Sequence, residues 1–462
     1  MKNNIYQYLI TVLLSAFLLV SCDNYLDVEP KGIQVLEAVQ DYNQWLNCAV
    51  VMYTPKSEEL NLLADNVDNP DILMTSESTT DRIYTWKNQF SEEVKADPLI
   101  WADHYRSIYY FNTVLEGIDD AKGSELEKKS LKAEALLGRA FEYLYLVNIY
   151  GKPYNSSSAN EDLSVPFVTS NDINDPVPLR STVQEIYNHI ITDITTAIPD
   201  LPQDNSQNRF RGSIAAAYSV LARVYLYMGN YTKASQNAQL ALDNGPNNVM
   251  DFNEMFCVYD MPELLIRSDA IYARFTSNLQ EIPSLAYLQS FDMTDLRLLF
   301  FFFDYPFSPV PDQEAFSLLS RGEVMYSRNA YPNRGTSVAE MRLIIAETAA
   351  RANDLSSACN ELDLIRKCRI LSDSYVKYVS NNQEDVLQKV LQERAFEFPY
   401  CGMRWFDMRR LDAEGRMQAV NRHDGSGNII ATLSPGSPKY TLQIPIQVLY
   451  YNPDWPQNLW AE

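Results

Sequence analysis

The chain has 462 residues, 46% of them hydrophobic and 21% charged, and these proportions exclude general disorder. Its 38 Lys and Arg residues against 60 Asp and Glu residues give a net charge of −22. Nucleic acids and anionic lipid surfaces are bound mainly through basic residues, so the charge balance argues against both partners. An acidic surface favours neutral or cationic ligands.

Residues 1–21 are typical of a secretory signal peptide. Lys2 supplies the positive start, and the apolar stretch 9–20 is too short to span a bilayer. The sequence LVSC, which ends at Cys22, resembles a bacterial lipobox. We therefore expect residues 1–21 to be removed and the mature chain to be tethered through an acylated Cys22. Ordinary cleavage beside an incidental cysteine is the alternative.

Helical periodicity dominates the first half of the chain after this segment. Apolar residues recur at three- and four-residue steps from Trp101 to Leu115. A long helix is predicted from about Ser124 to Tyr150, and another from Thr182 to Ala197. These stripes are interpreted as core-facing sides of helices.

The clearest internal signal is a helix–turn–helix repeat between residues 218 and 246. It matches the tetratricopeptide spacing W-x₂-L-G-x₂-Y…A-x₃-F…P, with Tyr for Trp, Ala for Gly and Ala for Phe. The matching residues are Tyr218, Leu221, Ala222, Tyr225, Ala234, Ala238, Ala241 and Pro246. A weaker copy runs from Ala346 to Ile365, with its turn at Asn353. Because one such unit cannot bury its own apolar face, further helix pairs must be present, and residues 101–150 are the natural source.

Residues 54–98 and 246–335 are rich in Pro, Asn, Asp, Ser and aromatic residues and have weak periodicity. They predict long loops and short strands laid over the helical scaffold. Within them, Phe300–Phe303 is interpreted as a buried strand. Residues 421–441 are predicted to form a surface loop, followed by a short strand over Thr441–Ile446.

Five stretches of the chain carry motifs that occur together in one family. They are LKAEALLGRAFEYLYLVNIYG at 131–151, the helix and Leu-Pro exit at 178–202, GSIAAAYSVLARVYLYMGNYTKA at 212–234, the pattern ER…E…G.RWFD..R at 393–409, and the PI…NP…QN tail at 444–458. Together with the lipobox, they resemble the SusD/RagB family of outer-membrane nutrient-binding lipoproteins.

The resemblance implies a mostly α fold, in which four tetratricopeptide-like helix pairs pack against a loop-rich half with short strands that holds the ligand. It implies a signal peptide at 1–21, an N-terminal region at 22–245 and a C-terminal region at 246–462, the last two forming one globular unit. It also implies a lipoprotein of the outer membrane that faces the cell exterior. Its partner would be a SusC-like TonB-dependent barrel, to which it delivers an oligosaccharide; peptide capture is the alternative.

Catalytic motifs are not evident. The chain has three His residues, no HExxH, no G-x-S-x-G and no glycine-rich phosphate loop. Arg404 and Asp407 are interpreted as a structural ion pair or as part of a helix-end network. We expect no enzyme activity; a surface glycosidase would need two carboxylates facing each other across one cleft, about 5 to 9 Å apart.

A saccharide site needs aromatic rings for the apolar faces of a pyranose and polar side chains for its edges. Aromatic residues in polar, aperiodic segments are the candidates for such a site, because those in helical stripes belong to the core. The candidate ligand-binding residues are Tyr84, Trp86, Tyr326 and Tyr331, with Asp65, Asp68, Arg328 and Asn333 as polar partners. Replacing Trp86 by Ala is then expected to weaken binding without lowering thermal stability.

A calcium site is a further hypothesis for the segment ADNVDNPD. Asp65, Asp68 and Asp71 offer the oxygen ligands that calcium prefers. The spacing lacks the Gly and the terminal Glu of an EF-hand loop, and we otherwise expect no cofactor. The five cysteines after Cys22 match no metal motif and are expected to be buried, with Cys359 and Cys368 on one helix.

Overall fold

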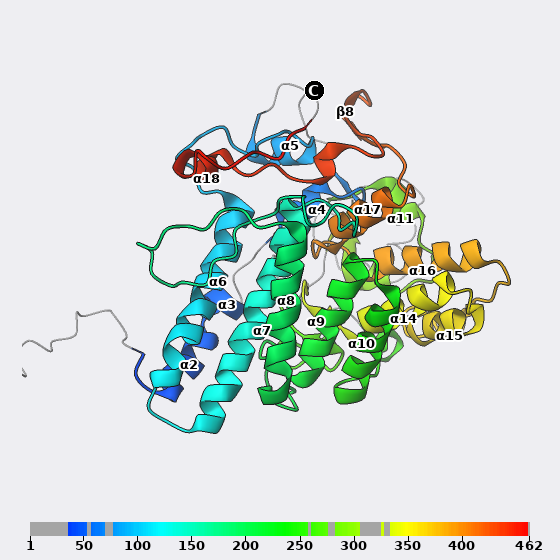
Figure 1. Ribbon diagram of the computed structural model, residues 1–462. Coiled ribbons are helices and arrows are strands. Elements are labelled where there is room, and N and C mark those ends of the chain that lie inside the picture. The colour runs from blue at the N-terminus through cyan, green and yellow to red at the C-terminus, as the bar shows by residue number, and fades with distance from the viewer. Residues whose placement is uncertain are drawn as a thin grey trace, which may run out of the picture.

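The computed structural model describes residues 36–52, 57–69, 77–256, 260–275, 282–304, 325–327 and 333–460. Long helices stand side by side in the lower part of the molecule, and short helices, a hairpin and the C-terminal segment cover them from above (Figure 1). This arrangement confirms the prediction of a mostly α fold. The signal segment and Cys22 lie outside the described residues.

The lower layer consists of long helices that contact one another in sequence order. They are α6 (Leu99–Gly117), α7 (Glu125–Tyr150), α8 (Val183–Ala197), α9 (Ile214–Tyr227), α10 (Tyr231–Asn244), α14 (Val338–Arg351), α15 (Leu355–Arg366) and α16 (Gln383–Glu397). At its edge lie α2 (Val39–Leu46) and α3 (Ala49–Met52).

Local capping explains where the predicted helix α8 starts, whereas the N-cap residue of α7 makes no side-chain capping hydrogen bond. The hydroxyl of Thr182 accepts a hydrogen bond from the Glu185 amide, and the Glu185 carboxylate accepts one from the Thr182 amide. This reciprocal capping box satisfies two backbone donors at the start of α8. Ser124 occupies the N-cap position of α7. Both helices therefore begin one residue after the predicted starts, and both end where predicted.

The repeat predicted between 218 and 246 is confirmed as the hairpin of α9 and α10. Its turn contains Gly229 at a φ of +69°, in the left-handed region that glycine adopts readily. Ala234, Ala238 and Ala241 of α10 are buried against α9. The weaker copy is confirmed as the hairpin of α14 and α15, with Asn353 at a φ of 62° in its turn.

The other described elements are short helices and two-stranded antiparallel ladders, several of which form an upper layer above the long helices. The helices are α4 (Glu59–Leu63), α5 (Thr79–Tyr84), α11 (Leu285–Gln289), α12 (Arg297–Phe301), α17 (Met403–Ala413) and α18 (Ile446–Tyr451). The ladders pair β1 (Val67–Asp68) with β3 (Ile282–Pro283), β2 (Ala270–Tyr272) with β6 (Thr336–Ser337), β4 (Phe302–Asp304) with β5 (Met325–Ser327), and β7 (Val420–His423) with β8 (Ile429–Leu433).

Several local predictions for these parts of the chain are wrong. The expected loop at 421–441 contains the β7–β8 hairpin. The expected strand at Thr441–Ile446 is absent: the Leu442 amide donates to the carbonyl of Ile149 at the end of α7, and the Ile444 amide donates to the side chain of Gln457. Because both backbone amides already have hydrogen-bond acceptors, this segment does not need to pair with a strand. The run Phe300–Phe303 is divided between α12 and β4, although its first three rings are buried as expected.

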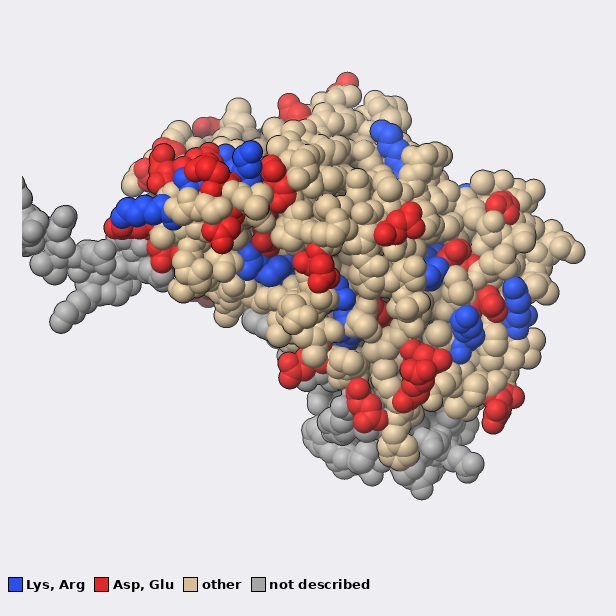
Figure 2. All heavy atoms as spheres, turned by 90° about the horizontal axis from the view of Figure 1, so that it is seen from below, with Lys and Arg blue, Asp and Glu red and all other residues tan. Residues whose placement is uncertain are grey.

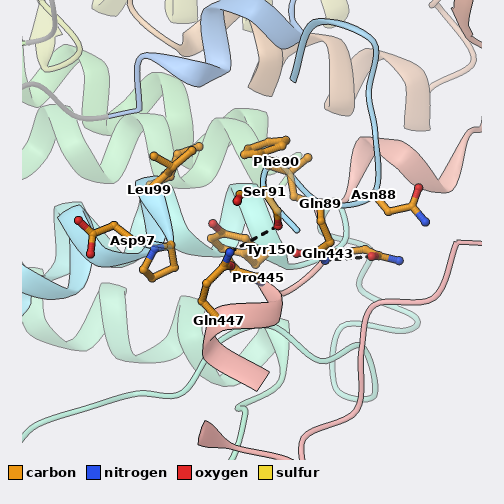
Figure 3. A pocket seen from close by; sticks show the side chains of 13 residues that line it. Asn88, Gln89, Phe90, Ser91, Asp97, Leu99, Tyr150, Gln443, Pro445 and Gln447 are labelled. Atoms are coloured by element: carbon orange, nitrogen blue, oxygen red, sulfur yellow. Dashed lines mark hydrogen bonds between the residues drawn. The ribbon is translucent and has the colours of Figure 1, made fainter. Parts of the chain in front are cut away.

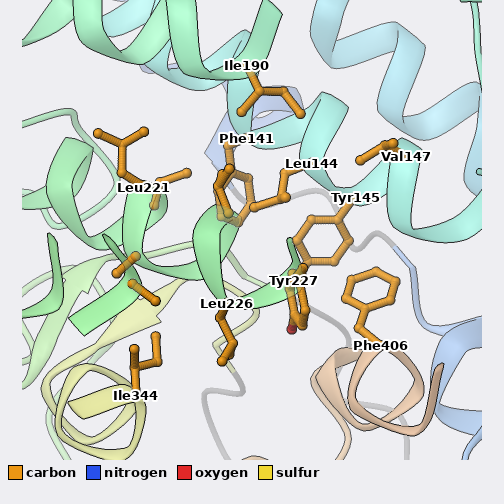
Figure 4. Packing of buried hydrophobic residues seen from close by; sticks show 14 of the residues in the cluster. Phe141, Leu144, Tyr145, Val147, Ile190, Leu221, Leu226, Tyr227, Ile344 and Phe406 are labelled. Atoms are coloured by element: carbon orange, nitrogen blue, oxygen red, sulfur yellow. The ribbon is translucent and has the colours of Figure 1, made fainter. Parts of the chain in front are cut away.

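The main core joins the helical layer to α17 (Figure 4). The rings of Tyr145 and Phe406 meet edge to face, with centroids 5.1 Å apart, and Tyr227 meets Phe406 in the same way at 5.8 Å. Such aromatic pairs add stability beyond the area that they bury. Of the described cysteines, Cys359, Cys368 and Cys401 are buried as expected, whereas Cys48 is only partly buried. The helix α15 ends before Cys368, so the two cysteines Cys359 and Cys368 do not share a helix.

Buried ion pairs link the two layers as well. Arg410 of α17 donates two hydrogen bonds to Glu347 of α14, at 2.6 and 2.9 Å. Asp407 pairs with Arg394 and with Arg410, each at 2.8 Å. Arg404 and Asp407 do not pair with each other, since Arg404 binds the carboxylate of Asp65, but both belong to structural ion pairs of α17, in line with the predicted network.

The described helices contain none that is both long enough and apolar enough to cross a lipid bilayer. On the face seen in Figure 2, acidic and basic side chains are interspersed, with no continuous basic patch. That face offers no surface suited to a polyanion.

Candidate functional site

Tyr84 and Trp86 do not offer their rings to a ligand; each is 1% exposed. The guanidinium of Arg422 lies 4.2 Å from the ring centroid of Tyr84 and 4.5 Å from that of Trp86. The indole nitrogen of Trp86 donates to the carbonyl of Leu63 at 3.0 Å. Burial raises the pKa of Tyr84 to about 12, so its phenol is neutral. The expectation that these rings form exposed platforms is wrong.

The polar candidates are engaged in structural contacts. Asp65 accepts hydrogen bonds from Arg404 at 2.7 and 2.6 Å. Burial alone would raise the pKa of Asp65, but the charge of Arg404 outweighs it and lowers the pKa. Asp68 accepts from the Tyr84 hydroxyl at 2.9 Å. The Asn333 side-chain oxygen accepts from the amides of Arg274 and Gly335, both at 2.9 Å. These contacts do not bring the candidates together around one cavity.

The remaining candidates are not described in full. Tyr326 belongs to β5 by its backbone, and its side chain lies outside the described residues, as do Arg328 and Tyr331. Asp71 of the calcium hypothesis lies outside them too, so that hypothesis stays a prediction. Among the residues that are described, no group of three His, Cys, Asp or Glu side chains could hold a metal ion.

A cavity of about 710 Å³ lies beside the predicted segment, at residues 87–92 that follow Trp86. It opens between this stretch, α5 and the C-terminal residues 443–457. A smaller recess adjoins it and shares residues 88–91 and Gln443 with it (Figure 3). We call the two hollows together the amide cavity. Its lining contains the side chains of Asn88, Gln89, Gln443, Gln447 and Gln457.

Three of these amide side chains build the walls. The Gln89 side chain donates to Gln443 at 3.1 Å and accepts from the Ile446 amide at 2.9 Å. Gln447 donates to the carbonyl of Glu93 at 2.8 Å. Gln457 accepts from the Ile444 amide and donates back to the Ile444 carbonyl. These bonds join the segment after Trp86 to the C-terminal segment and hold the cavity open in a fixed shape.

Other polar groups of the amide cavity are available for a ligand. The exposed side chain of Asn88 has no hydrogen-bond partner in the described part of the chain, and neither has the side-chain nitrogen of Gln443. Tyr150 lines the recess, where burial raises the pKa of its phenol and keeps the hydroxyl neutral. Phe90 and Leu99 give the recess an apolar side. Donors and acceptors without charge therefore surround an apolar surface.

The charged residues of the larger hollow of the amide cavity offset one another. Arg82 binds Glu77 at 2.5 Å and Glu92 at 2.8 Å, and donates to the carbonyl of Gln89 at 2.9 Å. Lys87 lies 3.9 Å from Glu77. Two basic side chains face two acidic ones in the larger hollow, and the exposed Asp97 adds one acidic side chain at the recess. The cavity therefore presents no strong positive field, which suits a neutral polar ligand better than an anionic one.

A Ser–His–Glu chain elsewhere in the molecule has the hydrogen-bond order of a hydrolase triad. Nε2 of His104 lies 2.6 Å from the Ser57 hydroxyl, and Nδ1 lies 2.6 Å from the Glu142 carboxylate. The three residues are 3%, 0% and 0% exposed, and neither hollow of the amide cavity reaches them. Since a nucleophile must meet its substrate, this chain is a structural crosslink between α6, α7 and the start of α4.

Sequence models of known families match two parts of the chain. One, described as starch-binding associating with outer membrane, matches residues 24–226. Another, described as the SusD family, matches residues 337–459. Together they span more than half of the chain, and the description of the first names binding.

Individual relatives are distant in sequence. A SusD-like protein P2 of Formosa agariphila is 24% identical over 373 residues, which cover 67% of this chain and 71% of the relative. A SusD-like protein of Bacteroides ovatus is 27% identical over 129 residues, 27% of this chain and 21% of the relative.

Solved structures share the fold. A SusD superfamily protein of Bacteroides thetaiotaomicron superposes with a TM-score of 0.71 at 20% identity, covering 91% of this chain and all of the other. A SusD-like carbohydrate-binding protein of Bacteroides vulgatus superposes with a TM-score of 0.67 at 18% identity, covering 91% of this chain and 97% of the other. Surface glycan-binding protein A of Bacteroides uniformis superposes with a TM-score of 0.66 at 18% identity, covering 91% of this chain and 99% of the other. With both ends of the chain matched by family models and its fold by these structures, the protein belongs to the SusD/RagB family.

Proposed function

We propose that this protein is a cell-surface binding protein that captures a neutral oligosaccharide in the amide cavity. The observation that carries the proposal is a set of uncharged polar groups beside an apolar recess: the Asn88 side chain, the side-chain nitrogen of Gln443 and the Tyr150 hydroxyl. A pyranose has hydroxyl groups around its edge and C–H groups on its faces, so it needs both kinds of surface. The carbohydrate-binding and glycan-binding structural neighbours support this ligand class.

The place of the protein in the cell is part of the same proposal. The lipobox at Cys22 supports a lipid tether, and the association of the family with the outer membrane supports that location. We propose that the tethered protein faces the cell exterior and passes its ligand to a SusC-like TonB-dependent barrel. Peptide capture is the competing ligand class, because a peptide backbone also offers neutral donors and acceptors.

Calorimetric titration of the chain from Asp23 onward tests the ligand class. The panel contains neutral oligosaccharides, acidic oligosaccharides and mixed peptides. We expect saturable heat with neutral oligosaccharides. Asn88→Ala and Gln443→Ala should each weaken that binding about fivefold, the effect of losing one uncharged hydrogen bond. Asn88→Ala should keep the thermal unfolding midpoint of the wild type, whereas Gln443→Ala also removes the acceptor of the Gln89 side chain and should lower the midpoint slightly.

Gln236→Ala is the matched control, because Gln236 is an exposed amide on α10, outside the lining of the amide cavity. It should bind like the wild type. If only the peptides give saturable heat of binding, the ligand is a peptide and not a saccharide. If Asn88→Ala and Gln443→Ala bind the saccharide as tightly as the wild type, the proposed function stands but the amide cavity is not the binding site.

A further inference from the structure

A second hollow, of about 620 Å³, lies between α6, the segment 166–178 and α18, and shares no lining residue with the amide cavity. Its floor contains Trp101, Ile108, Val448 and Trp455. Its wall carries aliphatic side chains that are unusual at a surface: Ile173 is 90% exposed and Val177 is 53% exposed. Leu179, two residues after Val177, is 74% exposed. We call this feature the aliphatic groove.

Buried polar side chains hold the wall of the groove in place. Asn112, which is 0% exposed, donates to the carbonyls of Val168 and Ser170 at 3.0 and 3.3 Å. Arg180, which is 7% exposed, donates to the carbonyls of Ser164 and Pro456 at 2.6 and 2.5 Å. The aliphatic side chains are therefore presented by a fixed backbone. Contiguous exposed apolar surface of this kind marks interaction sites.

The backbone of the wall has free donors at alternate residues. The amides of Val177 and Leu179 make no hydrogen bond within the described part of the chain. Pro176 and Pro178 have no amide hydrogen, and each holds the residue before it in an extended conformation. In an extended segment alternate residues point to the same side. The wall thus resembles the edge of a strand, which pairs with an extended polypeptide.

The groove suits a polypeptide better than a saccharide. Trp101 and Trp455 are only 7% and 8% exposed, and Trp101 packs against the rings of Tyr105 and Tyr150. Their faces are not offered for stacking on a sugar. Among the described residues that line the groove, the charged side chains are Asp172 and Asp175, both exposed. An occupant with basic residues complements them.

We propose that the aliphatic groove is a docking site for a protein partner that contributes an extended segment with apolar side chains and flanking Lys or Arg. The segment pairs with the amides of Val177 and Leu179, places its apolar side chains over the floor, and meets Asp172 and Asp175 with its basic residues. This site is separate from the amide cavity and does not depend on saccharide binding there.

Selection from a phage-displayed library of random 12-residue peptides tests this proposal with the intact chain from Asp23. The selected peptides are then synthesised and titrated by fluorescence anisotropy. We expect enrichment of peptides with apolar residues at alternate positions and basic residues near their ends. Leu179→Asp should weaken their binding at least tenfold, and Val177→Pro, which removes one donor but keeps an apolar side chain, about fivefold.

Leu240→Asp is the control, because Leu240 is a 39% exposed leucine on α10, outside the lining of the groove. It should leave peptide binding unchanged, and all three variants should unfold at the wild-type temperature. The proposal is overturned if no peptide is enriched, if the enriched peptides are acidic, or if they bind Leu179→Asp as well as the wild type. Competition by neutral oligosaccharides would also overturn it, since the two sites would then be one.

Discussion

At the scale of single residues, Trp86 belongs to the core. Its ring is 1% exposed, and its indole nitrogen is bonded to the Leu63 carbonyl. Arg422, which lies over the ring, also donates to the carbonyls of Leu62, Ala64, Val67 and Tyr84. The indole thus covers a guanidinium that organises four backbone carbonyls, and its removal leaves both a void and an uncovered charge.

Trp86→Ala is accordingly expected to lower the free energy of unfolding by about 3 to 5 kcal/mol, the usual cost of removing a buried tryptophan side chain. Urea denaturation followed by circular dichroism measures this difference. Tyr450→Ala serves as the control, because Tyr450 is 65% exposed and its truncation should cost less than about 0.5 kcal/mol. Equal stability of wild type and Trp86→Ala would show that the ring is not core.

The amide cavity adjoins the segment in which the sequence predicted ligand-binding residues, but Tyr84 and Trp86 do not line it. An aromatic residue in a polar stretch is a reasonable candidate for a platform, and local composition does not reveal that Arg422, far along the chain, covers Tyr84 and Trp86. The neighbouring Asn88 and Gln89 were visible as polar residues in the same stretch. Their role depends on Gln443, which only the folded chain brings beside them.

At the scale of elements, local signals located the helices and misplaced the strands. The start of α8 is set by hydrogen bonds between Thr182 and Glu185, which lie within one helical turn. The start of this helix can therefore be predicted from the local sequence. The β7–β8 hairpin was missed because its polar Asp–Gly turn is typical of a loop. The apolar run after Thr441 was assigned to a strand because periodicity does not show that its amides bond to α7 and to Gln457.

The small residues of α10 allow its close approach to α9, and this spacing can be tested. Ala238 is 0% exposed, so Ala238→Leu is expected to destabilise the protein by about 1 to 3 kcal/mol through overpacking. Chemical denaturation provides the measurement. Gln236→Leu adds a comparable apolar side chain on the exposed side of the same helix and should change stability little. A stability gain in Ala238→Leu would mean that the hairpin has unfilled space.

At the scale of the whole molecule, buried ion pairs join the repeat layer to the C-terminal half. Glu347 is 0% exposed and binds Arg410 and Arg351. Burial alone would raise the pKa of Glu347, but the charge and hydrogen bonds of Arg410, with Arg351, outweigh it and lower the pKa below the usual value of 4.5. Glu347 therefore stabilises the fold above about pH 4.5, and this contribution is lost as the pH falls through the lowered pKa.

Glu347→Gln is expected to cost about 3 kcal/mol at neutral pH, because Arg410 and Arg351 lose a buried counter-charge. The difference from wild type should stay constant between about pH 6 and pH 8 and shrink as the pH falls below about 4.5. Unfolding free energies at a series of pH values measure it. A difference that is independent of pH across this range would mean that the glutamate acts by packing alone.

The family and the fold class were predictable from motifs spread along the chain, because those motifs fix packing between helices. The division of the chain at residue 245 stays a prediction. Pairings such as Glu347 with Arg410 were not predictable, since a chain with 60 acidic and 38 basic residues allows too many combinations.

The walls of the amide cavity come from opposite ends of the polypeptide. Gln89 and Gln443, which bond to each other, are 354 positions apart, and Gln457 completes the frame close to the last residue. During synthesis the first wall leaves the ribosome long before the second exists. The amide cavity can therefore form only once both segments have been made, and a copy that stops before Gln443 would lack one wall of the proposed site.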